Sequence, residues 1–278
     1  PAYISSKLQF IDFKRNDGWD ILSRSLRLAA SQQKLEISQG ITYGPFNFSS
    51  EVFKEEYNKI PGHEIEIAYP RIESHTLPKS AKLISDYFSG KAALHIFSER
   101  TSLWPGTPYW DEEYKHTYTS SYNESYNISY CNENVMSILH SVHWYGAGAA
   151  HPNSHFETSN FVITKDDYAY KFSLWDVFTE GKEQEAINKI KQKIISESAR
   201  EFWEKTGEKP SEDDISTFAT GIMDSNLDSF TINSDGFRFH FAPYEIHAYA
   251  FGSWEFFISF FEVIDFLKED GIYSLIRS

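Results

Sequence analysis

The sequence has very little cysteine and no hydrophobic run long enough to cross a membrane. Cys131 is the only cysteine among 278 residues, which excludes an internal disulfide and a cysteine-based zinc site, because both need at least two. The most apolar stretch, residues 248–267, contains Glu255, Glu262 and Asp265, so it falls short of the roughly 18 uncharged residues that a membrane helix needs. We therefore predict no disulfide and no membrane span within these residues.

Several signatures of enzyme chemistry are also missing. The sequence has no Gly-x-Ser-x-Gly elbow, no phosphate-binding loop and no Gly-x-Gly-x-x-Gly motif. His63-Glu64 is followed by Ile67 where a zinc protease would need a second histidine. A nucleophile, base and acid brought together from distant positions would need no motif, but the sequence offers no direct support for one. We predict a protein that is not an enzyme and needs no cofactor.

Basic residues are outnumbered by acidic ones, at 26 against 40, so the formal net charge is −14. A surface of this sign repels the phosphate backbone, which excludes nucleic acid as an expected partner. The same surface attracts cationic proteins, although it is also an ordinary means of staying in solution. Aromatic residues make up 17% of the chain, a composition typical of folded proteins and not of disordered ones.

The hydrophobic pattern predicts an α+β fold. Alternation predicts strands at 64–69, 92–97, 114–130, 135–144, 156–163, 168–172, 230–232, 237–241 and 255–260. Helical spacing predicts helices at 20–33, 80–89, 183–204 and 262–267, and another that begins at Ser211. Because strands dominate without strict strand–helix alternation, we expect antiparallel sheets with helices packed on one side, in two intimately associated subdomains.

Three groups of residues are candidates for chemistry or binding. Trp104, Tyr109 and Trp110 lie in a loop rich in Pro and Gly, where burial and ligand binding are both open alternatives. Four histidines form the second group. His140 and His143 would point to opposite faces of a strand, which favours structural roles over a metal site. Two acidic pairs could supply carboxylates for glycoside chemistry, although solvated loops explain them better. The histidines are His140, His143, His151 and His155, and the acidic pairs are Asp111 with Glu113 and Asp166 with Asp167.

The segment from Tyr145 to Asn153, with the sequence YGAGAAHPN, resembles the "Tyr-x-Gly-Gly-Ala-His-Pro" signature of the RsiV-like family of bacterial extracytoplasmic domains. These domains occur in an anti-sigma factor ectodomain and before a peptidoglycan deacetylase domain. Further segments resemble the family in the same order, and together they span roughly residues 64–267. They are Ala68-Tyr69-Pro70, residues 174–178 (LWDVF), residues 235–239 (DGFRF), residues 243–246 (PYEI) and Gly252.

The resemblance implies a boundary near residue 64. Residues 1–63 would form an N-terminal extension packed on the core, and residues 64–278 the RsiV-like domain, with halves at 64–135 and 136–278. It also implies a periplasmic or cell-surface protein. The sequence begins at Pro1 without Met, which is compatible with the removal of a signal peptide or lipid anchor.

The resemblance further implies a noncatalytic recognition domain. The expected partner is a lysozyme-like cell-wall hydrolase, a cationic protein such as a lysozyme or a muramidase toxin, that is sensed, inhibited or countered by immunity. Binding of peptidoglycan fragments or another glycan is the first alternative, and hydrolysis by a carboxylate pair is the second. The candidate binding residues are Trp104, Tyr109, Trp110, Tyr145, Gly148, His151, Pro152, Asn153 and Tyr244, with no metal ligand among them.

Overall fold

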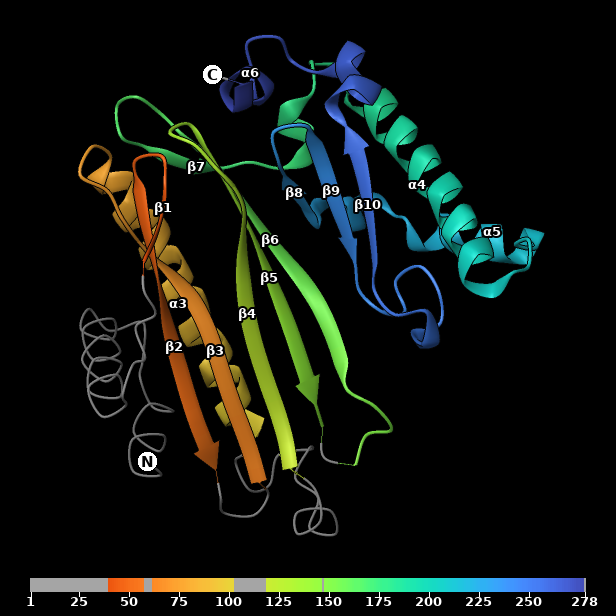
Figure 1. Ribbon diagram of the computed structural model, residues 1–278, viewed down its shortest axis with the longest axis horizontal. Coiled ribbons are helices and arrows are strands. Elements are labelled where there is room, and N and C mark those ends of the chain that lie inside the picture. Colours follow the sequence, from red (N-terminus) through yellow and green to blue (C-terminus); the bar gives the residue numbers. More distant parts are fainter. Residues whose placement is uncertain (1–39, 58–61, 103–118, 147, 278) are drawn as a thin grey trace, which may run out of the picture.

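The computed structural model describes residues 40–57, 62–102, 119–146 and 148–277. Its larger part is a seven-stranded sheet in which the strands follow one another in chain order (Figure 1). The strands are β1 (Ile41–Tyr43), β2 (Phe46–Tyr57), β3 (Gly62–Glu73), β4 (Thr119–Cys131), β5 (Val135–Tyr145), β6 (Asn153–Ile163) and β7 (Ala169–Lys171). All neighbouring pairs are antiparallel except β3 and β4. A parallel pair needs a long crossover connection, and the connection from β3 to β4 contains a helix.

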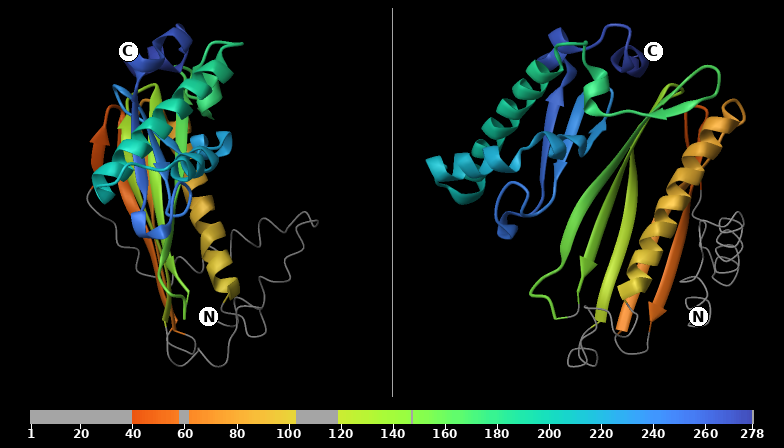
Figure 2. Two further views of the ribbon diagram at one scale, coloured as in Figure 1. Left: turned by 90° about the vertical axis from the view of Figure 1, so that its right-hand side faces the viewer. Right: turned by 180° about the vertical axis from the view of Figure 1, so that it is seen from behind.

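That helix, α3 (Pro78–Ser102), lies along one face of the sheet (Figure 2). The sequence predicted a helix that ends at Gly90 and a strand at 92–97, and this prediction is wrong because the helix continues to Ser102. Ile84, Phe88 and Ala92 are buried at intervals of four residues, which is the spacing of one helical face. Gly90 is not among the glycines with positive φ, so it does not adopt the left-handed conformation with which glycine commonly ends a helix.

The smaller part is a three-stranded antiparallel sheet covered by helices. Its elements are β8 (Phe230–Ile232), β9 (Gly236–Phe241), β10 (Trp254–Ser259), α4 (Glu183–Thr206), α5 (Glu212–Gly221) and α6 (Ile272–Arg277), with short 3₁₀ turns η1 (Leu174–Val177), η2 (Asp224–Asp228), η3 (Tyr249–Phe251) and η4 (Phe260–Phe266). The expected start of α5 is confirmed, because the Ser211 hydroxyl accepts from the Asp214 backbone N–H and the Asp214 carboxylate accepts from Ser211. The helix predicted at 262–267 is the 3₁₀ turn η4.

Buried hydrogen bonds join the two parts. The Ser137 hydroxyl on β5 donates to Asn160 at 2.7 Å and accepts from the Ile232 backbone N–H at 3.0 Å. The Asn160 amide on β6 donates to the Phe230 carbonyl at 2.9 Å. The small sheet is therefore fixed to the large one along β5, β6 and β8, which confirms the predicted α+β class with two associated subdomains.

The domain boundaries expected at residues 63 and 135 fall inside β3 and at the first residue of β5. The predicted helix at 20–33 lies outside the described residues. Among the described helices, none is long and apolar enough to span a membrane.

Candidate functional site

Two loops from different sheets meet at what we call the loop junction, formed by residues 145–146 and 148–153 after β5 and residues 242–252 after β9. His151 is its centre. Its Nδ1 donates to the Pro152 carbonyl at 3.0 Å, so its Nε2 accepts from the Tyr244 hydroxyl at 3.0 Å. The His151 ring stacks on Tyr249, with centroids 3.7 Å apart, and the Tyr249 hydroxyl donates to the Pro152 carbonyl at 2.7 Å.

The loop junction brings together several of the residues singled out from the sequence. Tyr145 ends β5, Asn153 begins β6, and Gly148 has a φ of 82°, a left-handed conformation that glycine adopts without strain. Tyr249 was not singled out in the sequence, because only folding places it beside His151. The predicted binding residues Trp104, Tyr109 and Trp110, and the carboxylates of Asp111 and Glu113, lie outside the described residues.

The backbone of Tyr244 is strained. Its φ is 74°, which a bulky side chain rarely adopts, yet its side chain is 59% exposed. Burial of the ring therefore does not offset the cost of this conformation, which is about 1–2 kcal/mol. In this conformation the tyrosine ring is exposed, and its hydroxyl is hydrogen-bonded to His151.

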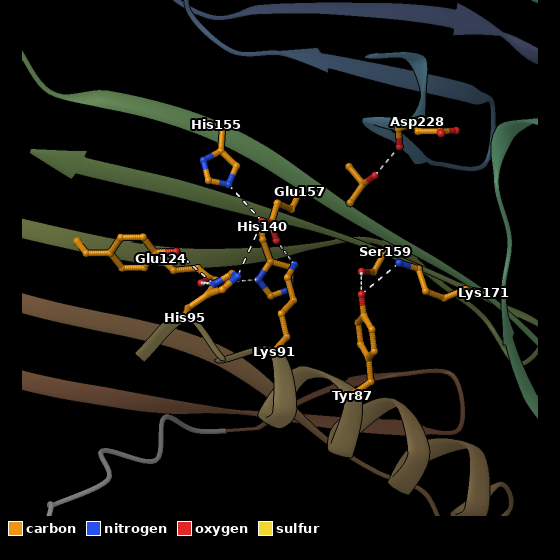
Figure 3. A network of polar contacts seen from close by, with 12 residues as sticks. Tyr87, Lys91, His95, Glu124, His140, His155, Glu157, Ser159, Lys171 and Asp228 are labelled. Atoms are coloured by element: carbon orange, nitrogen blue, oxygen red, sulfur yellow. Dashed lines mark hydrogen bonds and ion pairs between the residues drawn. The ribbon is translucent and has the colours of Figure 1, made fainter. Parts of the chain in front are cut away.

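A second polar cluster lies between α3 and the sheet and was not found from the sequence (Figure 3). Glu124 on β4 is only 3% exposed. Its carboxylate accepts from Nδ1 of His95 at 2.6 Å and from Nδ1 of His140 at 2.9 Å. Beside it, Glu157 on β6 forms an ion pair with Lys91 and accepts from Nε2 of His155 at 3.2 Å. We call these six residues the buried network.

Burial and hydrogen bonding set the charges in the buried network. Burial alone would raise the pKa of Glu124, but the bonds from His140 and His95 outweigh it and lower the pKa to about 2. The bond to Glu124 raises the pKa of His95, whereas burial lowers that of His140. His155 and Lys91 lower the pKa of Glu157. His95 is therefore more readily protonated than a free histidine and His140 less readily, while Lys91 pairs with the second carboxylate, Glu157.

The four histidines weighed as metal ligands are dispersed in the structure. His140 is buried under α3, whereas His143 is exposed, as strand alternation predicts. His151 lies in the loop junction and His155 in the buried network. Within the described ranges no group of three or more His, Cys, Asp or Glu side chains has the geometry of a metal site. A charged residue at an inward position of β4, between Tyr122 and Tyr126, is the one sequence signal that could have revealed the network.

The carboxylate pair at 166–167 also has a structural role. Asp167 accepts from the backbone N–H groups of Lys79 and Ser80, each at 2.8 Å, so it caps the first turn of α3. Burial by itself would raise the pKa of Asp167, but these two hydrogen bonds lower it. The turn predicted at these residues connects β6 and β7, and Asp167 caps α3.

Comparisons of the sequence and the fold with known proteins find similarity to domains of unknown function. Residues 175–260 match the family model described as "Protein of unknown function (DUF3298)". No curated protein matches the chain. A solved structure of a DUF3298 family protein from Pseudomonas aeruginosa has 13% identity and a TM-score of 0.53, covering 79% of this chain and 94% of its own. A member of the same family from Bacteroides fragilis has 15% identity and a TM-score of 0.50, covering 84% and 98%.

Neither solved structure is close enough in sequence to carry more than the fold. The family match begins in η1 and ends at the first residue of η4, so it contains α4, α5 and all three strands of the small sheet. It also includes Tyr244 and Tyr249 of the loop junction. In sequence over residues 175–260 and in fold over most of its length, the protein is similar to proteins of the DUF3298 family.

Proposed function

We propose that this protein is a noncatalytic recognition domain of the bacterial extracytoplasmic space and that it binds a lysozyme-like cell-wall hydrolase through the loop junction. The observation that carries the proposal is the strained and exposed Tyr244, whose hydroxyl is fixed by His151. Backbone strain of this kind is concentrated at binding and catalytic sites. Tyrosine is also among the residues that dominate the energy of protein interfaces.

The charge of the chain supports a cationic partner. A net charge of −14 accelerates encounter with a basic protein at low salt and makes the association rate fall as salt rises. The resemblance of the segment from Tyr145 to Asn153 to RsiV-like domains supports a lysozyme-like muramidase as that partner. Sensing, inhibition and immunity are three outcomes of the same binding event.

A glycan is the second candidate ligand, and the exposed ring of Tyr244 favours it. Aromatic rings present an apolar face that stacks on sugars, and the ring of Tyr249 lies 5.5 Å from that of Tyr244. Hydrolysis by a carboxylate pair has less support from the described residues, because Asp167 caps α3.

Biolayer interferometry of the full chain against a panel of lysozymes and soluble peptidoglycan fragments, at two salt concentrations, tests the proposal. We expect salt-sensitive binding to at least one lysozyme, which Tyr244→Gly weakens by at least about tenfold, because hot-spot residues contribute 2 kcal/mol or more. Glycine accepts the φ of 74° at this position, so the substitution removes the ring and leaves the backbone unstrained.

Tyr170→Ala is the matched control, since Tyr170 on β7 is 58% exposed and lies outside the loop junction. It should leave binding unchanged. Suppose that no lysozyme binds, while peptidoglycan fragments bind at both salt concentrations and Tyr244→Gly abolishes this binding. The ligand would then be a glycan and not a protein. Binding that Tyr244→Gly leaves intact would refute the loop junction as the contact surface.

A further inference from the structure

A hollow of about 420 Å³ lies between α3 and strands β2 and β3, and it shares no residue with the loop junction. Figure 2 shows α3 running along these two strands. The volume falls at the lower end of the roughly 300–1,000 Å³ found for small-molecule sites, which suits a ligand of the size of an amino acid or a dipeptide. The residues that line it are Glu51, Tyr69, Arg71, Ile72, Glu73, Ser74, Pro78, Ala81, Lys82, Ser85, Asp86 and Ser89.

The lining carries charges of both signs. Arg71 pairs with Glu51 at 3.3 Å and with Glu73 at 3.2 Å, and Lys82 pairs with Asp86. The side chains of Arg71 and Lys82 are 54% and 73% exposed, and ion pairs this exposed contribute little to stability. A ligand with one positive and one negative group can therefore replace these partners without leaving a charge unpaired.

Two of the polar groups in the hollow are held in place. The Glu51 carboxylate, whose side chain is 20% exposed, accepts from the Tyr69 hydroxyl at 2.9 Å. Burial and the negative charge of Glu51 raise the pKa of Tyr69, so the phenol keeps its proton and remains the donor. The Ser85 hydroxyl oxygen accepts from the Ile72 backbone N–H at 3.2 Å, which leaves the hydroxyl hydrogen for another acceptor.

We propose that this hollow binds a small zwitterion, a free amino acid or a dipeptide, whose ammonium group is bound by Glu51 and whose carboxylate is bound by Arg71 and Ser85. Charge-assisted hydrogen bonds of this kind are shorter and stronger than neutral ones. The excess of carboxylates over cations in the lining disfavours phosphorylated ligands, which carry two or more negative charges. The site is independent of the function proposed above.

Isothermal titration calorimetry of the full chain at pH 7 with alanine and with L-alanyl-L-alanine tests this site. We expect saturable binding of at least one of them at millimolar concentration. N-acetyl and C-amide derivatives of the bound probe should each bind at least about tenfold more weakly, because each removes one charge-assisted hydrogen bond.

Glu51→Gln and Arg71→Gln should each weaken binding of the unblocked probe by at least about tenfold. Glu56→Gln should have no effect, because Glu56 also belongs to β2 but is exposed and lies outside the lining. Circular dichroism verifies folding, and if Glu51→Gln does not fold, the exposed Arg71→Gln decides. Absence of saturable binding, equal affinity for the blocked probes, or unchanged affinity in the folded variants would overturn the proposal.

Discussion

The buried network makes the stability of this protein sensitive to acid, and Glu124 is the residue with which to test it. The pKa of Glu124 falls from 4.5 to about 2 on folding, and this difference corresponds to roughly 3 kcal/mol of stability. Because the folded pKa is the lower one, the contribution is fully present above pH 4.5. It is lost as the pH falls toward 2, where the folded protein also takes up the proton.

Glu124→Gln removes this titration. At pH 5 we expect the variant to lose roughly 3 kcal/mol of unfolding free energy relative to the wild type, as expected when one partner of a buried ion pair is removed. At pH 3 the loss should be smaller by roughly 2 kcal/mol, since the unfolded wild-type chain then binds a proton that the folded chain does not. The two neighbouring histidines are shifted in opposite directions, since the bond to Glu124 raises the pKa of His95 and burial lowers that of His140.

Urea unfolding at pH 5 and pH 3 measures both quantities. Glu66→Gln is the control, because Glu66 forms an exposed ion pair with Lys54 and should change stability by less than about 0.5 kcal/mol at either pH. An equal loss for Glu124→Gln at the two pH values would refute the reasoning, since it would mean that the carboxylate does not titrate in this interval.

Three further substitutions test the fold. Asp167→Ala should lower the free energy of unfolding by about 1 kcal/mol through loss of the α3 cap. Asp166→Ala should lower it by less than half as much, and equal melting temperatures for the two variants would contradict the cap. Gly236→Ala should cost about 1–3 kcal/mol or more, because the added Cβ would lie 2.2 Å from the Ile258 carbonyl oxygen, and an unchanged urea midpoint would disprove this close contact. Gly90→Ala should instead stabilise α3 by about 0.5–1 kcal/mol, since the space around it is open, and a loss in thermal unfolding would count against a continuous helix.

Elements set by neighbouring residues were predicted from the sequence. The strands at 135–144 and 156–163, the helix at 183–204 and the capped start at Ser211 all appear within a few residues of their expected bounds. Alternation and helical spacing report which face of an element is apolar, and the capping box lies within four residues. The α+β class follows from the same local signals.

The continuation of α3 past Gly90 was not predicted. Apolar residues at 84, 88 and 92 recur every four positions, as in a helix, but the segment 92–97 that follows also has the apolar pattern of a short strand. Only packing against the sheet distinguishes the two, since Ala92 is buried with Ile65 and Ile67. The parallel pairing of β3 with β4 likewise depends on where the helix between them lies.

The candidate sites depend on contacts between distant residues. His151 and Tyr244 are separated by 93 positions, and Asp167 caps a helix 88 positions earlier in the chain. The sequence by itself determined that His151 and Tyr244 belong to turns and that the surface is acidic. Only the tertiary structure decided that these turns meet, that Glu124 faces two histidines, and that β2, β3 and α3 enclose a hollow, because such contacts arise when separate faces bury their apolar surface together.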